Sequence, residues 1–182
     1  MFQIVIFVLG TLGLVFVSRK SIHKPGTHGF YRFFAWELML LLYVLNLPVW
    51  DVDMDATHQA VAGIFFMISL FLVVVGVLQL FFMGKPDEKR DDVPLLHFEK
   101  TTVLVTSGIY RYIRHPIYGS LFFLCWGFFF KCPSLLGAVL ALMSSAFLIA
   151  TARVEEAECI RFFGESYRDY MKRSKMLVPF IL

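Results

Sequence analysis

The stretch AVAGIFFMISLFLVVVGVLQLFFM, from Ala60 to Met83, contains no charged residue. A transmembrane helix needs about 20 consecutive, predominantly apolar residues to cross the hydrocarbon core, and this stretch is long enough. The rest of the chain has the same character, since 58% of its 182 residues are hydrophobic and 17% are aromatic, against roughly 45–50% apolar residues in soluble domains. The composition therefore excludes a soluble globular domain and predicts an integral membrane protein.

Four further apolar runs flank this stretch, two before it and two after it. Together the five runs are Met1–Val17, Phe33–Trp50, Ala60–Met83, Ile117–Phe130 and Ser134–Ala152. The fourth run is short, and we expect Arg114 and Lys131 to reach the headgroups from its two ends. Only Lys131-Cys132-Pro133 separates the last two runs. The predicted fold is all-α, with five transmembrane helices of which the last two form a tight helical hairpin.

Charge predicts the orientation of these spans. The first connection carries Arg19, Lys20, Lys24 and Arg32, whereas the second is the acidic segment 51–55 without Lys or Arg. Because basic residues favour cytoplasmic connections, we expect the N-terminus outside and the C-terminus in the cytoplasm. The net charge of +3 arises from this bias, and we interpret it as membrane topology and contact with anionic lipids rather than nucleic-acid binding.

The chain divides into two regions. Residues 1–83 hold three predicted transmembrane helices, and residues 84–182 hold a mixed-charge linker (Gly84–Leu95), the hairpin and a polar tail. The tail Ala152–Arg173 has helical periodicity interrupted by Gly164, which predicts a cytoplasmic amphipathic helix with Glu158 facing water. We expect Gln79 to hydrogen-bond a neighbouring helix. The three cysteines lack metal-ligand spacing, and we predict no metal site.

Two polar clusters flank the hairpin. The segment LVTSGIYRYIRHPIYG, Leu104–Gly119, ends in Arg-His-Pro against an apolar run, and Glu155-Glu156 follows the last run. After Gly108, the residues up to Pro116 can wind as a short helix in which Tyr110 and Arg114, and Arg111 and His115, are i,i+4 pairs. Pro116 suits the first turn of the next helix, which places His115 at a helix N-terminus that favours an anion. A short hairpin brings both clusters together, and opposite charges at one site suit a zwitterionic, cationic cofactor such as S-adenosylmethionine. Taken alone, the glutamates also fit a solvated helix end paired with Arg153, and His115 fits a helix cap.

The combination of these motifs resembles a known family. The Leu104–Gly119 segment, the two-span hairpin and the later residues are similar to the integral-membrane methyltransferases typified by isoprenylcysteine carboxyl methyltransferase, with phospholipid N-methyltransferases as relatives. The resemblance covers about residues 104–182, and its later part consists of Glu155, Glu156, Phe163, Gly164, Tyr167, Tyr170 and Pro179. Two linked motifs at this spacing are more specific than either alone.

This resemblance implies a cofactor, a site and a substrate route. It implies that S-adenosylmethionine is bound, and that the acceptor arrives from the bilayer. The cofactor-binding residues implied are Gly108, Tyr110, His115, Tyr118, Glu155 and Glu156. Arg114 or Arg153 would face the substrate as catalytic residues. Thr151 stands where the carboxyl methyltransferases carry an arginine, so the resemblance does not decide whether this protein binds a substrate carboxylate.

Three functional hypotheses follow. The first is methyl transfer to a lipophilic or lipidated acceptor such as an isoprenylcysteine carboxylate. The second is methylation of a phospholipid amine or a small thiol by the same fold. The third is a non-enzymatic membrane scaffold or permease. Opposed charge at the membrane edge favours the first two, and an intramembrane ionisable residue, Glu37, is either functional or at headgroup depth.

Overall fold

Six α-helices form the structure, a computed structural model that describes residues 1–87, 96 and 99–178. The helices are α1 (Phe2–Ile22), α2 (His28–Asn46), α3 (Thr57–Met83), α4 (Pro116–Lys131), α5 (Leu135–Phe163) and α6 (Glu165–Arg173), with short 3₁₀ helices η1 (Leu47–Val49) and η3 (Gly108–Arg111). No regular strand occurs in the described part of the chain. The all-α prediction is confirmed. Most of the predicted linker, residues 88–95, lies outside the described residues.

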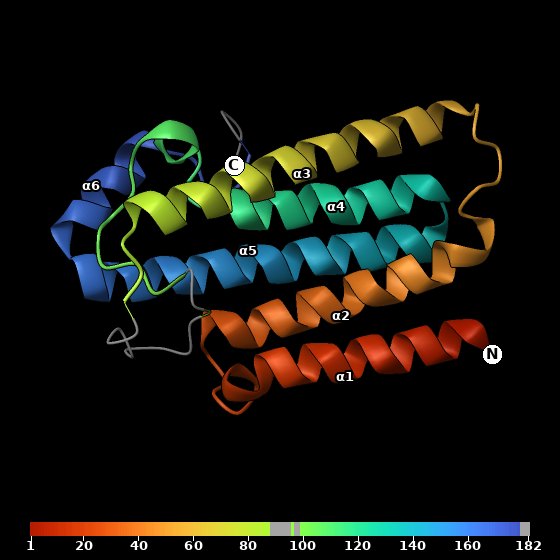
Figure 1. The fold of residues 1–182 in the computed structure, drawn as a ribbon, viewed down its shortest axis with the longest axis horizontal. Coiled ribbons are helices and arrows are strands. Elements are labelled where there is room, and N and C mark those ends of the chain that lie inside the picture. Colours follow the sequence, from red (N-terminus) through yellow and green to blue (C-terminus); the bar gives the residue numbers. More distant parts are fainter. Residues whose placement is uncertain (88–95, 97–98, 179–182) are drawn as a thin grey trace.

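The helices lie side by side in a single bundle (Figure 1). Four of them, α1, α2 with η1, α3 and α5, are long and apolar enough to cross a membrane, and α4 is a shorter apolar helix. Helix α4 packs between α3 and α5, while α2 packs on α5 and carries α1 on its other side. These apolar helices confirm an integral membrane protein.

The short helix α4 ends inside the protein. Side chains of three other residues serve its last carbonyl groups: Asn46 donates to the Phe128 oxygen at 2.6 Å, His58 lies 2.9 Å from the Phe130 oxygen, and Gln59 donates to the Lys131 oxygen at 3.2 Å. These contacts satisfy the carbonyl groups that a helix end leaves unpaired.

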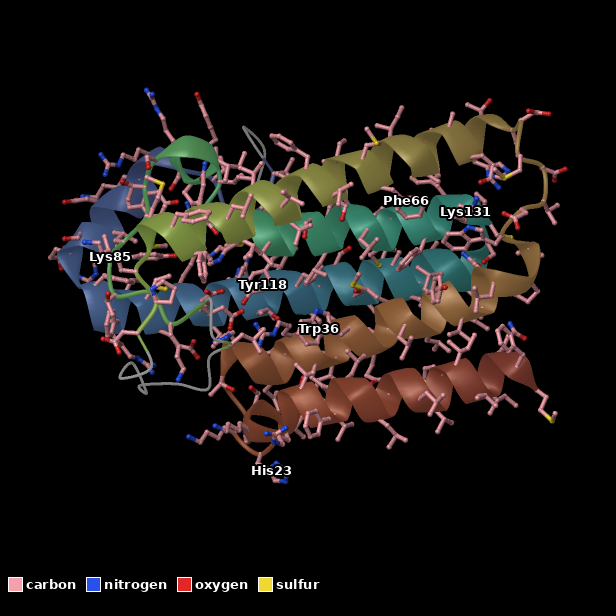
Figure 2. The ribbon with its side chains drawn as sticks, viewed as in Figure 1. His23, Trp36, Phe66, Lys85, Tyr118 and Lys131 are labelled. Carbon is pink, nitrogen blue, oxygen red and sulfur yellow. The ribbon has the colours of Figure 1, made fainter. Side chains whose placement is uncertain are left out.

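Lys131 itself differs from our expectation. Its side chain was expected to reach the headgroups, but the residue is only 7% exposed, and its ammonium lies 4.9 Å from the centroid of the Trp50 ring. A cation over an indole face replaces the expected solvation. Lys131 lies at the end of the bundle opposite His23 (Figure 2).

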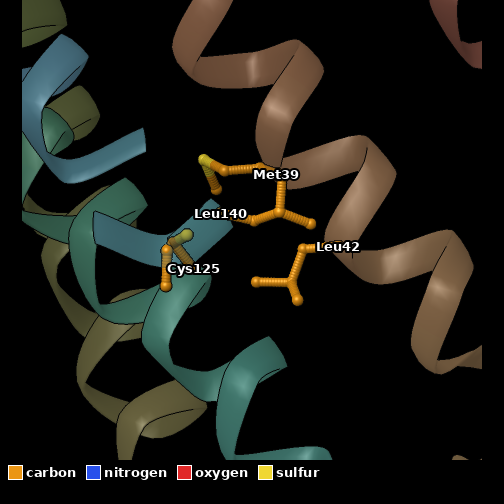
Figure 3. Packing of buried hydrophobic residues seen from close by; sticks show 5 residues of the cluster. Met39, Leu42, Cys125 and Leu140 are labelled. Carbon is orange, nitrogen blue, oxygen red and sulfur yellow. The ribbon is translucent and has the colours of Figure 1, made fainter. Parts of the chain in front are cut away.

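The apolar core lies between α2, α4 and α5. Met39 and Leu42 of α2 contact Cys125 of α4 and Leu140 of α5 (Figure 3). Farther along the same interface, the Ser144 hydroxyl donates to the Ala35 carbonyl at 3.1 Å, so α2 and α5 approach closely. Small and medium-sized side chains therefore fix the position of α5, on which Glu155 and Glu156 lie.

The polar segments lie together at the end of the bundle beside α6, opposite the turn between α4 and α5 (Figure 1). Gly164, with φ +64°, interrupts the helix between α5 and α6, as predicted. The tail beyond α6 runs beside residues 112–115, since the backbone N–H of Arg114 donates to the Lys175 oxygen at 2.8 Å and that of His115 to the Met176 oxygen at 3.0 Å.

Two local expectations need correction. The segment after Gly108 was expected to wind as a helix through Pro116, but only η3 is helical and an extended pairing with the tail follows it. The Gln79 side chain was expected to bond a neighbouring helix, but its oxygen accepts from the backbone N–H of Ile109 in η3 at 3.1 Å. Hydrogen bonds to the tail and to Gln79 of α3 therefore determine the conformation of this segment.

The contact between α3 and α4 yields a stability prediction. A Cβ added at Gly127 would lie 2.5 Å from Cε1 of the Phe66 ring. Overpacking of this kind costs about 1–3 kcal/mol, and each kcal/mol lowers the melting temperature by roughly 2–4 °C in a chain of this size. We expect Gly127→Ala to lower the melting temperature of the detergent-purified protein, measured by differential scanning fluorimetry, by a few degrees.

Gly63→Ala is the matched control. Gly63 lies in α3 with nothing within 4 Å of an added Cβ. Because alanine favours a helix over glycine by up to about 1 kcal/mol, this variant should be unchanged or more stable. Equal melting temperatures for the two variants would contradict the close approach of α3 and α4.

Candidate functional site

The segment from Gly108 to Pro116 is held against α3 and α6. Gly108 has φ +59°, and an added Cβ would collide with the Gln79 side chain, so this position requires glycine. The Tyr110 hydroxyl donates to the Gly76 oxygen at 3.3 Å, and the Tyr110 carbonyl accepts from the Tyr170 hydroxyl at 2.5 Å. Gly108 and Tyr110 thus fix the path of the chain toward His115.

His115 is the N-cap residue of α4, directly before Pro116. Its Nδ1 lies 3.4 Å from Oε2 of Glu155 and its Nε2 lies 3.6 Å from Oε1 of Glu156. These are ion-pair distances rather than hydrogen bonds, and both His115 Nε2 and Glu155 Oε2 are buried without a hydrogen-bond partner. The structure therefore brings the two predicted clusters together and leaves some of their polar atoms unpaired.

Arg114 and Arg153 occupy different positions. The Arg114 Nε and Nη2 atoms each lie 2.7 Å from Oε1 of Glu156, and its Nη1 donates to the carbonyls of Met171 and Ser174. Arg114 thus joins the start of α4, α5 and the C-terminal end of α6. Arg153 is exposed on α5 and does not border the site.

A pocket opens between these residues. Its empty volume is about 740 Å³, including the part open to solvent. Tyr118 on the first turns of α4 lines it, is 3% exposed, and stacks on His115 with 5.5 Å between ring centroids. The Tyr118 hydroxyl also lacks a hydrogen-bond partner. Tyr118 lies toward the end of the bundle opposite Lys131 (Figure 2).

The remaining lining is mostly apolar and aromatic. Of the predicted site residues, Tyr110, Arg114, His115, Tyr118 and Glu155 border the pocket directly. Glu156 does not line the pocket but pairs with His115 and Arg114, which do. Gly108 does not line the pocket either, and it determines only the path of the backbone toward His115. The other lining residues are Leu80, Glu99, Thr101, Leu104, Val105, Pro116, Ile117, Glu158, Cys159, Phe163, Tyr167 and Tyr170.

Sequence reasoning missed a second ionic cluster beside the pocket. His28 and Arg32, at the start of α2, pair with Glu99 from the third connection and with Glu158 of α5. The His28 Nδ1 lies 2.5 Å from Oε2 of Glu158, its Nε2 lies 3.7 Å from Oε2 of Glu99, and Arg32 forms an ion pair with Glu99.

The second cluster corrects two expectations. Glu158 was expected to face water, but it is 4% exposed, and Arg32 was counted as a cytoplasmic loop cation, but it is 4% exposed in α2. One signal was present in the sequence: His28 and Arg32 are spaced i,i+4 and Glu155 and Glu158 are spaced i,i+3, so each pair shares a helix face. Glu99 carried no such signal, because its partners lie far away in the chain.

Electrostatics keep charges of both signs in the buried site. Burial alone would lower the pKa of His115, but Glu155 and Glu156 outweigh it and raise that pKa above its usual value. Burial alone would raise the pKa of Glu99, but the Arg32 guanidinium and His28 lower it. In the described residues, no group of acidic, histidine or cysteine side chains could hold a metal ion. The buried site therefore holds groups of both charges.

Comparisons with known proteins point to one family. The family described as phospholipid methyltransferase matches residues 57–166, which is more than half of the chain. A protein of Crocosphaera subtropica named methanethiol S-methyltransferase is 24% identical over 179 residues, covering 89% of this chain and 64% of that protein. Mouse protein-S-isoprenylcysteine O-methyltransferase is 42% identical over 82 residues, covering 44% of this chain and 29% of that protein.

The chain spans less than two thirds of the length of these two relatives. No solved structure matches it. The family match includes α3, α4, the whole of α5 and the start of α6, and therefore both His115 and the Glu155-Glu156 pair. The membrane helices, the paired clusters and this match together show that the chain belongs to the phospholipid methyltransferase family of integral-membrane methyltransferases.

Proposed function

We propose that the protein transfers a methyl group from S-adenosylmethionine to an acceptor that reaches the pocket from the membrane. The observation that carries this proposal is the set of buried, unpaired polar atoms on His115, Tyr118 and Glu155 around one pocket. Buried polar atoms without partners are costly in a folded protein, so a ligand that pairs with them stabilises the site. The family match supports the same reaction class.

The charges of the site fit this cofactor. Glu155 would accept hydrogen bonds from the ammonium group, and the His115 imidazole would donate to the carboxylate. Tyr110 and Tyr167 offer aromatic surface for the adenine ring in the same pocket. When bound, the cofactor supplies an electrophilic methyl group on a sulfonium. The protein's own residues mainly orient the two reactants and exclude water, which is the larger part of the catalytic task in such transfers.

Other residues hold the binding groups in place. Glu156 fixes Arg114 at 2.7 Å and lies 3.6 Å from His115, so it keeps both basic side chains on one side of the pocket. The carbonyl oxygen of Met176 in the tail accepts a hydrogen bond from the backbone N–H of His115. We place this end of the bundle in the cytoplasm, because the first connection beside it is basic and the second is acidic.

An apolar groove supports a lipophilic acceptor. The groove lies between α1, α2 and α4, and its lining includes Leu14, Trp36, Tyr43, Leu121 and Phe128. Its empty volume is about 990 Å³, including the part open to the surroundings. A hydrocarbon chain in this groove would stay in the membrane. The first candidate acceptor is thus a lipophilic molecule such as an isoprenylcysteine derivative, and the second is a small thiol, which the Crocosphaera relative's name favours.

Binding of S-adenosylhomocysteine, the demethylated product, tests the cofactor site. In isothermal titration calorimetry on detergent-purified protein, we expect Glu155→Gln and His115→Ala to weaken binding at least tenfold, because a hydrogen bond to a charged group contributes roughly 1.5–3 kcal/mol. Glu156→Gln should also weaken binding, through the release of Arg114.

Glu165→Gln is the matched control, since the Glu165 side chain on α6 is 78% exposed. It should bind like the wild type. A folded wild-type protein that binds no S-adenosylhomocysteine in detergent or in lipid nanodiscs would refute the enzyme and favour a scaffold or permease.

The raised pKa of His115 predicts a pH dependence of stability. Because its pKa is higher in the folded than in the unfolded state, His115 stabilises the fold fully below the unfolded value of about 6.5. This contribution is lost as the pH rises through the raised pKa of the folded state. We expect the melting temperature of the wild type to exceed that of His115→Gln at pH 6, and the difference to shrink toward pH 9.

The exposed His23 gives the control for this experiment. His23→Gln should leave the melting temperature close to that of the wild type across the same pH range. A difference between wild type and His115→Gln that stays constant or grows with pH would contradict a charged His115.

A further inference from the structure

The tail that follows α6 is tied to the segment before α4 by three successive backbone hydrogen bonds. The backbone N–H of Lys175 donates to the Tyr112 oxygen at 2.9 Å, and two more bonds run from the N–H groups of Arg114 and His115 back to the tail. A little farther along the tail, Leu177 is completely buried. The tail thus places one apolar side chain beside the start of α4, close to the proposed cofactor-binding residues.

Leu177 belongs to a buried apolar cluster that joins three parts of the chain. Its other buried members are Tyr118 of α4 and Ala152 of α5. The approach to α4 is close, because a Cβ added at Gly119 would lie only 2.8 Å from the Leu177 carbonyl oxygen. Leu177 therefore occupies the junction of α4, α5 and the tail.

This junction lies one helical turn from the charged pair of the site. Ala152 precedes Glu155 by three residues on α5, and His115 at the N-cap of α4 precedes Tyr118 by three, so each pair shares a face. Tyr118 also stacks on His115, with 5.5 Å between ring centroids. A change in the spacing of the two helices at Leu177 would therefore change the distance between His115 and Glu155.

We propose that Leu177 is a positioning residue that keeps α4 and α5 apart, so that His115 and Glu155 stay available to the cofactor instead of bonding to each other. The inference rests on the proposed function, because it concerns the same cofactor site. It adds a residue beyond the stretch that the family match covers, which ends at residue 166.

The observed spacing of the charged pair supports this role. His115 Nδ1 lies 3.4 Å from Glu155 Oε2, yet this oxygen has no hydrogen-bond partner among the described residues. Because opposite charges attract strongly in a buried site, a side chain of fixed bulk is needed to keep them at this separation. With a smaller side chain at Leu177, we expect the helices to approach each other. The pair would then close, and its polar atoms would no longer be free for a ligand.

Leu177→Ala tests this role in isothermal titration calorimetry with S-adenosylhomocysteine on detergent-purified protein. We expect binding to weaken about tenfold or more, because small displacements of positioned groups have effects of this order. Leu177→Met nearly conserves the volume of the side chain and should bind like the wild type. Equal binding by the wild type and Leu177→Ala would overturn the proposal.

Leu42→Ala separates positioning from general destabilisation. Leu42 is 1% exposed in α2, and its Cδ1 lies 3.5 Å from a Cβ added at Gly137, near the opposite end of α5 from Glu155. Both Leu→Ala variants should lower the melting temperature, because each leaves a cavity in a buried cluster. Only Leu177→Ala should lose affinity for S-adenosylhomocysteine. An equal loss of affinity in Leu42→Ala would reveal a general effect of destabilisation and overturn the proposal.

Gly119→Ala perturbs the same junction from the other side and decides the matter if Leu177→Ala does not fold. The added Cβ would press against the backbone of Leu177 and displace the tail, so we expect weaker S-adenosylhomocysteine binding. Gly127→Ala is the matched control, because it overpacks α4 against Phe66 of α3. Equally tight binding by these two glycine variants would contradict the role of the tail.

The double variant of His115→Ala and Leu177→Ala identifies the group through which Leu177 acts. If Leu177 positions His115, replacing it should weaken binding much less once the imidazole is absent. Losses of affinity that add fully would overturn the proposal. A wild type that binds no S-adenosylhomocysteine would refute the proposed function and this inference with it. Wild-type binding that survives Leu177→Ala unchanged would overturn this inference alone.

Discussion

The ion pair between Arg114 and Glu156 is the contact on which the rest of the site depends. It joins the segment before α4 to α5, and through the carbonyls of Met171 and Ser174 Arg114 also holds the C-terminal end of α6. Arg114 is 9% and Glu156 8% exposed in their side chains. Removing one partner of such a buried pair leaves an uncompensated charge, which is strongly destabilising. Three stretches of chain that are distant in sequence are thereby kept in one arrangement around the pocket.

A bundle of apolar helices imposes the second constraint. The apolar lengths of α2, α4 and α5 leave few polar atoms for specific recognition in the middle of the bundle, so most charged groups lie near the helix ends. Two ionic groups consequently lie at or beside the pocket: His115 with Glu155 and Glu156, and His28 and Arg32 with Glu99 and Glu158. Each group is close to internally balanced, which makes a deeply buried polar site tolerable.

Much of the fold and part of the candidate site could be predicted from the sequence. Apolar run length and the Lys131-Cys132-Pro133 turn indicate the helices, and the proline after His115 marks the start of α4. The pairing of His115 with Glu155 and Glu156 follows from a short hairpin between two known helix ends. Glu99 could not be predicted, because it lies in an irregular connection whose path depends on Arg32 and His28. Glu158 was wrongly assigned to water, because helical periodicity in a tail cannot reveal which face a distant segment covers.

The short length of α4 has a consequence for where the chemistry takes place. Its 16 residues rise about 24 Å at 1.5 Å each, less than the roughly 30 Å of a hydrocarbon core. At its far end, the side chains of Asn46, His58 and Gln59 bond the last carbonyl groups, so the helix ends there inside the protein and does not continue as exposed backbone. The N-cap residue His115 therefore lies inward of the ends of the longer helices α3 and α5 at this end of the bundle (Figure 1). Under the proposed function, an acceptor dissolved in the membrane and a water-soluble methyl donor would thus meet within the bundle, between the ends of α3 and α5, rather than beyond it.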